Sequence, residues 1–266
     1  MNIHIFHKNN KQMIIAISIH KGGTGKTTTA FSLGAAFVKQ GKKVLLIDLD
    51  AQCNLTTTCG INPLLENNVG RWLLEMFSFS EVVQSKLGMD IIPAAYELVS
   101  RESDIIKEQG SDSLLKYALQ EIKEEYDYII LDCPPSLGIM TTNALVAADK
   151  YIIPMLAATY SYEALGKMQN TIEKIKRRMN PSLELAGVLF TNSSTHDRTL
   201  LGKSIREATA QQVKVFQTSI RTNKALDEAA NAKQAIFDYD PDSTGAKDYL
   251  KLAEEIELQQ HSLADL

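Results

Sequence analysis

The segment MIIAISIHKGGTGKTTTAFSLGAAFV, residues 13–38, decides the fold of this chain. An apolar run over 13–19 predicts a buried strand, and the apolar residues after Thr29 recur at the spacing of one helix face. Between them lies a glycine-rich loop. Glycines let backbone N–H groups curl around an anion, and the helix N-terminus adds partial positive charge at the same point. The segment therefore predicts a strand, a phosphate-binding loop and a helix in direct succession.

The loop supplies side chains as well as backbone N–H groups. Lys26 stands where the lysine of P-loop NTPases reaches the β and γ phosphates, and Thr27 stands where their hydroxyl ligates Mg²⁺. His20 replaces the first glycine of the usual pattern. The expected ligands are ATP and Mg²⁺, with the nucleotide bound by eight consecutive residues: Lys21, Gly22, Gly23, Thr24, Gly25, Lys26, Thr27 and Thr28. We count Lys26 among the catalytic residues as well.

Two further predicted strands end in acidic residues. LLIDLDAQ places Asp48 and Asp50 after one apolar run, and YIILDCPP places Asp132 after another. A carboxylate at a buried strand end is costly unless it meets a metal ion or a hydrogen-bond donor. We therefore expect Asp132 to hold Mg²⁺ through water and Asp50 to orient the attacking water. Taken singly, each of these aspartates could instead cap a helix or a turn.

Apolar runs rich in Ile, Val and Leu recur along the chain and predict further strands. These runs cover 43–50, 89–94, 127–132, 150–156, 183–190 and 213–220. Helical periodicity over 111–125 and 161–178 lies between them. The alternation predicts an α/β fold with a doubly wound, mostly parallel sheet and helices on both faces. We expect one ATPase domain over 13–258, a short N-terminal extension over 1–12 and a C-terminal tail over 259–266, with mixed helix and loop over 56–80.

Composition places the chain among globular proteins. Of its 266 residues 44% are hydrophobic and 23% charged, and we find neither a signal peptide nor a membrane-spanning run, so we expect it in the cytoplasm. Its 3 cysteines, irregularly spaced, favour free thiols over a disulfide or a metal site. The net charge is −4, yet residues 167–224 carry eleven basic and four acidic residues, a net of +7. We call this segment the basic island; residues 225–266 carry three basic against ten acidic residues.

KGGTGKTTT, LLIDLDAQ and DCPPSLG resemble the three nucleotide motifs of the ParA-type partition ATPases, which belong with MinD to the deviant Walker A family. TSIRTNKALDEAANAKQAIFDYDPDSTGAKDYLKLAEEI resembles the family's C-terminal segment, so the likeness covers nearly the whole chain. The resemblance implies a homodimer with two ATP molecules sandwiched between its subunits. It also implies that Lys21 contacts the partner's ATP and is catalytic, that Asp50 serves hydrolysis and that Thr28 lies beside the α-phosphate.

The same resemblance implies further partners. ParA-type dimers bind DNA without sequence preference and act with an adaptor, here a ParB-like protein, so the chain would be nucleoid-associated when ATP-bound. The basic island supplies the candidate DNA contacts, which are Lys203, Arg206, Arg221 and Lys224. The sequence departs from the family at Ala51, where proline is usual, and at SIRTN, which replaces IPRN.

Other members of the wider family offer alternative functions. A MinD-like protein binds membrane through a basic amphipathic C-terminal helix, whereas YLKLAEEIELQQHSLADL carries one lysine against four acidic residues, so we expect no membrane binding. A relative of the nitrogenase iron protein would need paired cluster cysteines, which Cys133 alone does not supply. A ParA-like ATPase that positions a protein cargo on the nucleoid fits the sequence as well as one that segregates plasmid or chromosomal DNA.

Overall fold

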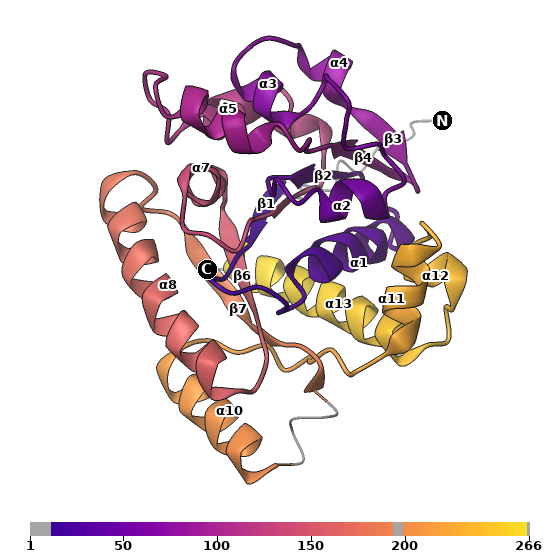
Figure 1. The fold of residues 1–266 in the computed structure, drawn as a ribbon. Coiled ribbons are helices and arrows are strands. Elements are labelled where there is room, and N and C mark those ends of the chain that lie inside the picture. Colours follow the sequence, from indigo (N-terminus) through magenta and orange to yellow (C-terminus); the bar gives the residue numbers. More distant parts are fainter. Residues whose placement is uncertain (1–11, 194–198, 265–266) are drawn as a thin grey trace, which may run out of the picture.

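The structure, a computed structural model, describes residues 12–193 and 199–264. Within these residues the strands form one 7-stranded sheet in the order β3-β4-β2-β5-β1-β6-β7 (Figure 1). All neighbouring strands run parallel except β3 and β4, which are antiparallel. The predicted doubly wound, mostly parallel α/β sheet is thus confirmed. The strands are β1 (Met13–Ile17), β2 (Val44–Asp48), β3 (Gln84–Lys86), β4 (Met89–Ile92), β5 (Tyr128–Asp132), β6 (Lys150–Met155) and β7 (Glu184–Phe190).

Helices cover both faces of the sheet, which is why its strands other than β3 are mostly apolar. Alternate residues of a strand point to opposite faces. Ile15 and Ile17 accordingly lie in a core with α1, α11, α12 and α13, whereas Ile14 and Ala16 lie in a second core with α3, α5, α6, α7 and α8. The helices are α1 (Lys26–Lys39), α2 (Asn54–Thr58), α3 (Val69–Leu73), α4 (Phe79–Val82), α5 (Leu98–Ile105), α6 (Leu114–Gln120), the short 3₁₀ helix η1 (Lys123–Glu125), α7 (Ile139–Ala147), α8 (Thr159–Arg178), α10 (Leu200–Gln212), α11 (Lys224–Asn231), α12 (Ile236–Tyr239) and α13 (Thr244–Ala264).

Helix α1 lies close against the sheet and is held there by α13. A Cβ on Gly34 would lie 2.8 Å from Cδ2 of Leu46, so the missing side chain lets α1 approach β2. On the other side of α1, the Tyr249 hydroxyl of α13 lies 3.3 Å from the Thr29 hydroxyl, and the Tyr249 ring is fully buried. These contacts fix the start of α1, and with it the loop that precedes the helix.

The strand predictions are confirmed except at one end of the sheet. The run over 213–220 forms no strand; a single bridge joins Val215 to Val188 of β7. The backbone N–H groups of Gln217 and Thr218 instead donate to the carboxylate of Glu255 in α13, at 2.8 and 2.9 Å. Conversely β3 was not predicted, because its sequence QSK is polar and short.

Three other segments complete the comparison with the sequence. Residues 56–80 hold the end of α2, then α3 and the first half of α4 with their connecting loops, which confirms the mixed assignment. The predicted helix over 111–125 is split between α6 and η1. Helix α13 continues past residue 258, our predicted domain end, to Ala264. All three cysteines are free and buried, as predicted. No helix of the described part is both long and apolar enough to cross a bilayer.

Candidate functional site

The loop between β1 and α1 forms an open cradle of backbone. Gly23 and Gly25 have φ angles of 70° and 83°, in the left-handed region that side chains disfavour. A Cβ on Gly22 or Gly23 would meet no atom within 4 Å, so the loop leaves open space there. Gly25 is the N-cap of α1, and no side chain of the described residues caps this helix end. The first N–H groups of α1 are therefore available to an anion.

Lys26 places a cation inside this cradle. It is the first residue of α1 and only 7% exposed, and its Nζ donates to the carbonyl oxygen of Lys21 at 2.9 Å. Burial lowers the pKa of Lys26, while the charges of Asp132, Cys133 and Asp50 act in the opposite direction. An ammonium has three N–H donors, and the bond to Lys21 uses one of them. The arrangement suits a polyphosphate, whose charge would offset the cost of burying this cation.

Asp132 reaches the same cradle from the end of β5. The register pairs Asp132 with Ile17 at the end of β1 and with Asp48 at the end of β2. It is 1% exposed, and neither of its carboxylate oxygens has a hydrogen-bond partner within the described residues. Burial and the charge of Asp48 raise its pKa well above the usual range, although Thr27 and Lys26 act to lower it.

A buried carboxylate without a partner is costly, so this residue fits a bound cation. Asp132 and the Thr27 hydroxyl are both oxygen donors, which Mg²⁺ prefers. The described residues contain no group of three His, Cys, Asp or Glu side chains that could hold a metal ion by themselves. An ion here would therefore take most of its ligands from water and phosphate, as Mg²⁺ commonly does. The residues present fit a Mg²⁺ ion that is bound together with a nucleotide.

The two aspartates that end and follow β2 have different surroundings. Asp48 is fully buried and accepts three hydrogen bonds, from Thr56 N at 2.9 Å, Thr56 Oγ1 at 2.7 Å and Asp50 N at 3.1 Å. Burial nevertheless raises the pKa of Asp48 to about 6. Asp48 thus anchors α2, in line with the capping role that the sequence left open. Asp50 is 9% exposed and accepts a bond from Gln52 N at 3.0 Å, so the 50–53 turn is ordered although Ala51 replaces the usual proline.

Two further loop residues were predicted from the motif. Lys21 is half-buried, and its carbonyl oxygen is the acceptor for Lys26 described above. Thr28 lies in the first turn of α1 and lines a small hollow together with Leu226 of α11 and Ile236 of α12. The predicted residues Lys21 to Thr28, Asp50 and Asp132 therefore all gather at the carboxyl edge of the sheet.

Sequence reasoning missed a residue that ties the loop to the far side of the sheet. Thr191 follows β7, and its hydroxyl donates to the carbonyl oxygen of Thr24 at 2.9 Å. Its backbone N–H donates to Met155 at the end of β6, also at 2.9 Å. The loop is thereby fixed to β6 and β7. The only signal in the sequence was a threonine directly after an apolar run.

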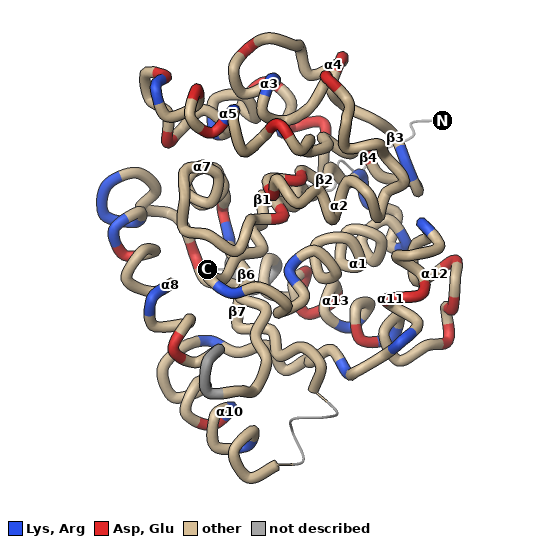
Figure 2. Tube along the Cα trace, viewed as in Figure 1, with Lys and Arg blue, Asp and Glu red and all other residues tan. Residues whose placement is uncertain are grey.

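The predicted DNA contacts do not form a single cluster in one chain. Lys203 is exposed on α10 and Lys224 is exposed at the start of α11, and these helices lie well apart in Figure 2. The Arg206 guanidinium stacks on the Phe190 ring, 4.3 Å from its centroid. Arg221 forms an ion pair with Asp248 at 2.6 Å.

Comparison with known proteins agrees with this geometry. A family model described as an AAA domain matches residues 12–185. The sporulation initiation inhibitor protein Soj of Bacillus subtilis is 39% identical over 91% of this chain and 97% of its own length. The chromosome partitioning protein ParA of Myxococcus xanthus is 34% identical over 91% of this chain and 87% of its own length.

A solved structure adds a likeness in three dimensions. The Mycobacterium smegmatis protein described as cobyrinic acid a,c-diamide synthase, with bound ADP and magnesium, superposes with a TM-score of 0.82 at 31% identity, covering 96% of this chain and 97% of that one. This chain aligns with 87–97% of the length of each of these three proteins. Its sheet, glycine loop and acidic strand ends are those that the motifs predict. The chain therefore belongs to the family of ParA-type partition ATPases.

Proposed function

We propose that this P-loop ATP hydrolase works as an ATP-gated homodimer that binds DNA without sequence preference and partitions a plasmid or chromosome with a ParB-like adaptor. The observation that carries the nucleotide part is the buried, unpartnered carboxylate of Asp132 beside Lys26 and Thr27. ATP would occupy the cradle of Lys21 to Thr28. Mg²⁺, when bound, would offset charge on the β and γ phosphates.

Each side chain then has a role in hydrolysis. Lys26 would bind the β and γ phosphates, and Thr27 and Asp132 would hold the metal ion, Asp132 through water. Asp50, anchored by Gln52 N, orients the attacking water. We assign Lys21 to the partner subunit's ATP, which makes the site complete only in the dimer.

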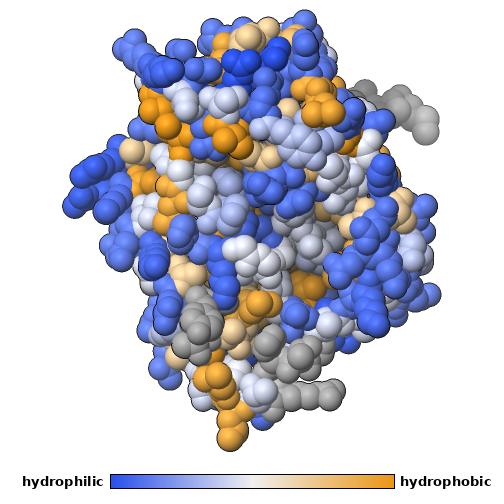
Figure 3. All heavy atoms as spheres, in the orientation of Figure 1, coloured by the Kyte–Doolittle hydropathy of each residue, from blue (hydrophilic) through white to orange (hydrophobic). Residues whose placement is uncertain are grey.

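The surface around the site supports dimer formation. Figure 3 shows apolar side chains exposed over α5 in its upper part. Tyr96, Val99 and Ile106, within and beside α5, are 53%, 66% and 59% exposed. Exposed apolar side chains that lie together favour an interface with another protein surface. A second copy of this chain is the occupant that the family suggests.

For DNA binding, the support is the basic island and its placement. Lys203 on α10 and Lys224 on α11 are exposed, whereas Arg221 is already paired with Asp248. Because these cations are spread over one chain, two subunits are needed to present several of them to one duplex. We therefore expect DNA binding to require ATP, and the affinity to fall steeply with salt as counterions are released from the phosphates.

A gel shift on unrelated duplexes with ATP, with ADP and without nucleotide tests this proposal. Lys203→Ala should weaken binding to all duplexes alike. The slope of the logarithm of the binding constant against the logarithm of the salt concentration should become shallower by about one unit for each lost phosphate contact. Lys86→Ala is the matched control, because Lys86 is exposed on β3 outside the basic island. Equal binding in all three nucleotide states would contradict the ATP gate, and absence of binding at low salt would contradict DNA as the partner.

A further inference from the structure

Glu102, in the middle of α5, is a carboxylate that the nucleotide motifs do not include. Its Oε2 lies 3.9 Å from the position that a Cβ on Gly138 would take, and the Ser136 hydroxyl lies 3.6 Å from the same point. Ser136 and Gly138 belong to the loop that follows Asp132 at the end of β5. Although Glu102 and Asp132 are distant in sequence, the Glu102 carboxylate thus lies against the loop that leaves the nucleotide site.

The Glu102 carboxylate is also close enough to the site for the charge of Asp50 to act on it. It is half-buried, and no hydrogen bond or ion pair to it occurs within residues 12–193 and 199–264. Burial raises its pKa, and the negative charge of Asp50 raises it further. A half-buried carboxylate near a like charge costs folding free energy and stabilises nothing around it. Such a group beside a nucleotide site is better explained by function than by the fold.

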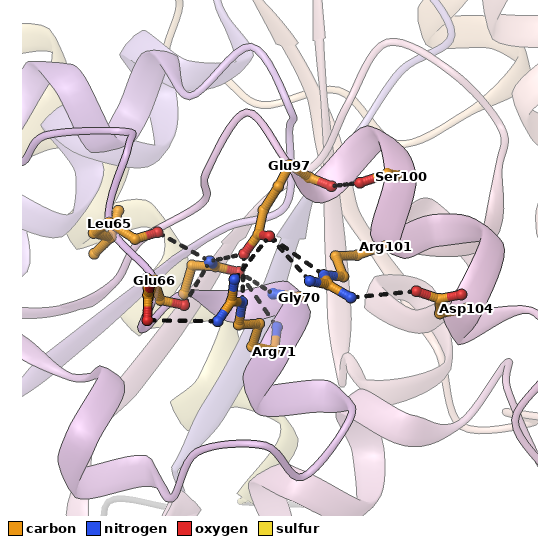
Figure 4. A network of polar contacts seen from close by, with 9 residues as sticks. Leu65, Glu66, Gly70, Arg71, Glu97, Ser100, Arg101 and Asp104 are labelled. Carbon is orange, nitrogen blue, oxygen red and sulfur yellow. Dashed lines mark hydrogen bonds and ion pairs between the residues drawn. The ribbon is translucent and has the colours of Figure 1, made fainter.

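A network of ion pairs fixes the position of α5 and hence of Glu102. Arg71 of α3 donates through Nε to Glu97 at 2.7 Å, and Arg101 donates to the same carboxylate at 3.2 Å (Figure 4). A Cβ on Gly70 would lie 2.9 Å from Cδ1 of Leu98, so α3 and α5 are in close contact. Arg101 immediately precedes Glu102. The network therefore fixes the turn of α5 from which Glu102 reaches toward the loop after Asp132.

We propose that Glu102 is a positioning residue for ATP hydrolysis, which acts with Asp50 to hold the attacking water. In the reaction, the water oxygen bonds to the γ-phosphorus as the bond from phosphorus to the β–γ bridging oxygen breaks. The electron pair of the broken bond leaves with ADP, and the water proton ends on the released phosphate. Glu102 orients this water and is unchanged by the reaction. The inference rests on the ATPase activity and not on DNA binding.

Single-turnover hydrolysis of bound ATP by the full chain tests the proposal. Glu102→Gln should lower the hydrolysis rate about ten- to a hundredfold, as expected when a water is misplaced, while the affinity for ATP stays within twofold. Because the substitution removes a half-buried charge that no cation offsets within the described residues, the melting temperature should stay the same or rise. Glu102→Asp keeps the charge on a shorter side chain and should recover part of the rate.

The matched control is Glu108→Gln, which removes the same charge from an exposed position beyond the end of α5. It should hydrolyse ATP at the wild-type rate. A Glu102→Gln rate within twofold of wild type would overturn the proposal. A lower rate accompanied by a lower melting temperature and weaker ATP binding would overturn it too, because that pattern indicates a structural role. Failure of the wild-type protein and Glu108→Gln to hydrolyse ATP would instead refute the ATPase assignment itself.

Discussion

Replacing Arg221 separates a structural role from a DNA-binding role. Its guanidinium donates through Nε and Nη2 to Asp248, at 2.9 and 2.6 Å, and its own backbone N–H donates to the same carboxylate at 3.0 Å. The Asp248 side chain is 6% exposed and that of Arg221 is 45% exposed. Arg221→Ala leaves a buried carboxylate with the backbone donor alone. A hydrogen bond to a charged group is worth about 1.5–3 kcal/mol, and solvent around Arg221 reduces this to about 1–2 kcal/mol.

Equilibrium unfolding in urea, without nucleotide or DNA, measures this loss. We expect Arg221→Ala to lower the free energy of unfolding by about 1–2 kcal/mol, with an unchanged dependence on urea concentration. Lys224→Ala, an exposed cation three positions further on, should stay within about 0.5 kcal/mol of wild type. An Arg221→Ala protein as stable as wild type would refute the argument that Asp248 depends on this pair. Its DNA affinity could then be interpreted as a direct contact.

The remaining predictions concern the nucleotide site and the α3–α5 network. Lys26→Ala should lose affinity for a fluorescent ATP analogue, and Asp132→Ala should lose the Mg²⁺ dependence of that binding; unchanged titrations would disprove the site assignment. Asp50→Ala should bind ATP and remain a dimer, because the switch needs hydrolysis to reset, and light scattering should detect this; a protein that never assembles would count against it. The hydrogen bond from Arg71, with those from Asn68 and Arg101, lowers the pKa of Glu97 to about 2. Its contribution to stability is therefore present above the unfolded-state pKa of 4.5 and is lost as the pH falls toward 2. Glu97→Gln should be less stable than wild type at pH 7, and the difference in melting temperature should shrink toward pH 2.

The sequence by itself determined the nucleotide loop and the class of fold. The loop is contiguous, and its function depends on backbone geometry that Gly23 and Gly25 permit locally. The strands other than β3 were readable because both faces of the sheet are covered there, which makes each of them a largely apolar run. Prediction failed at 213–220, which joins β7 only by the bridge at Val215, while Glu255 of α13 accepts from the N–H groups of Gln217 and Thr218. It also failed at β3, whose polar residues carry no apolar run.

Only the tertiary structure decided which side chains meet at and around the site. The strand order, and not any motif, sets Asp132 beside both Ile17 and Asp48. Likewise, only the hydrogen bonds from Thr56 to Asp48 show that Asp48 has a structural role that Asp50 does not share. Thr191, Glu102 and the pairing of Arg221 with Asp248 arise where elements distant in the chain pack together. Such contacts leave no periodic pattern in the sequence, because they depend on the register and the packing of whole elements and not on the local preference of any one residue.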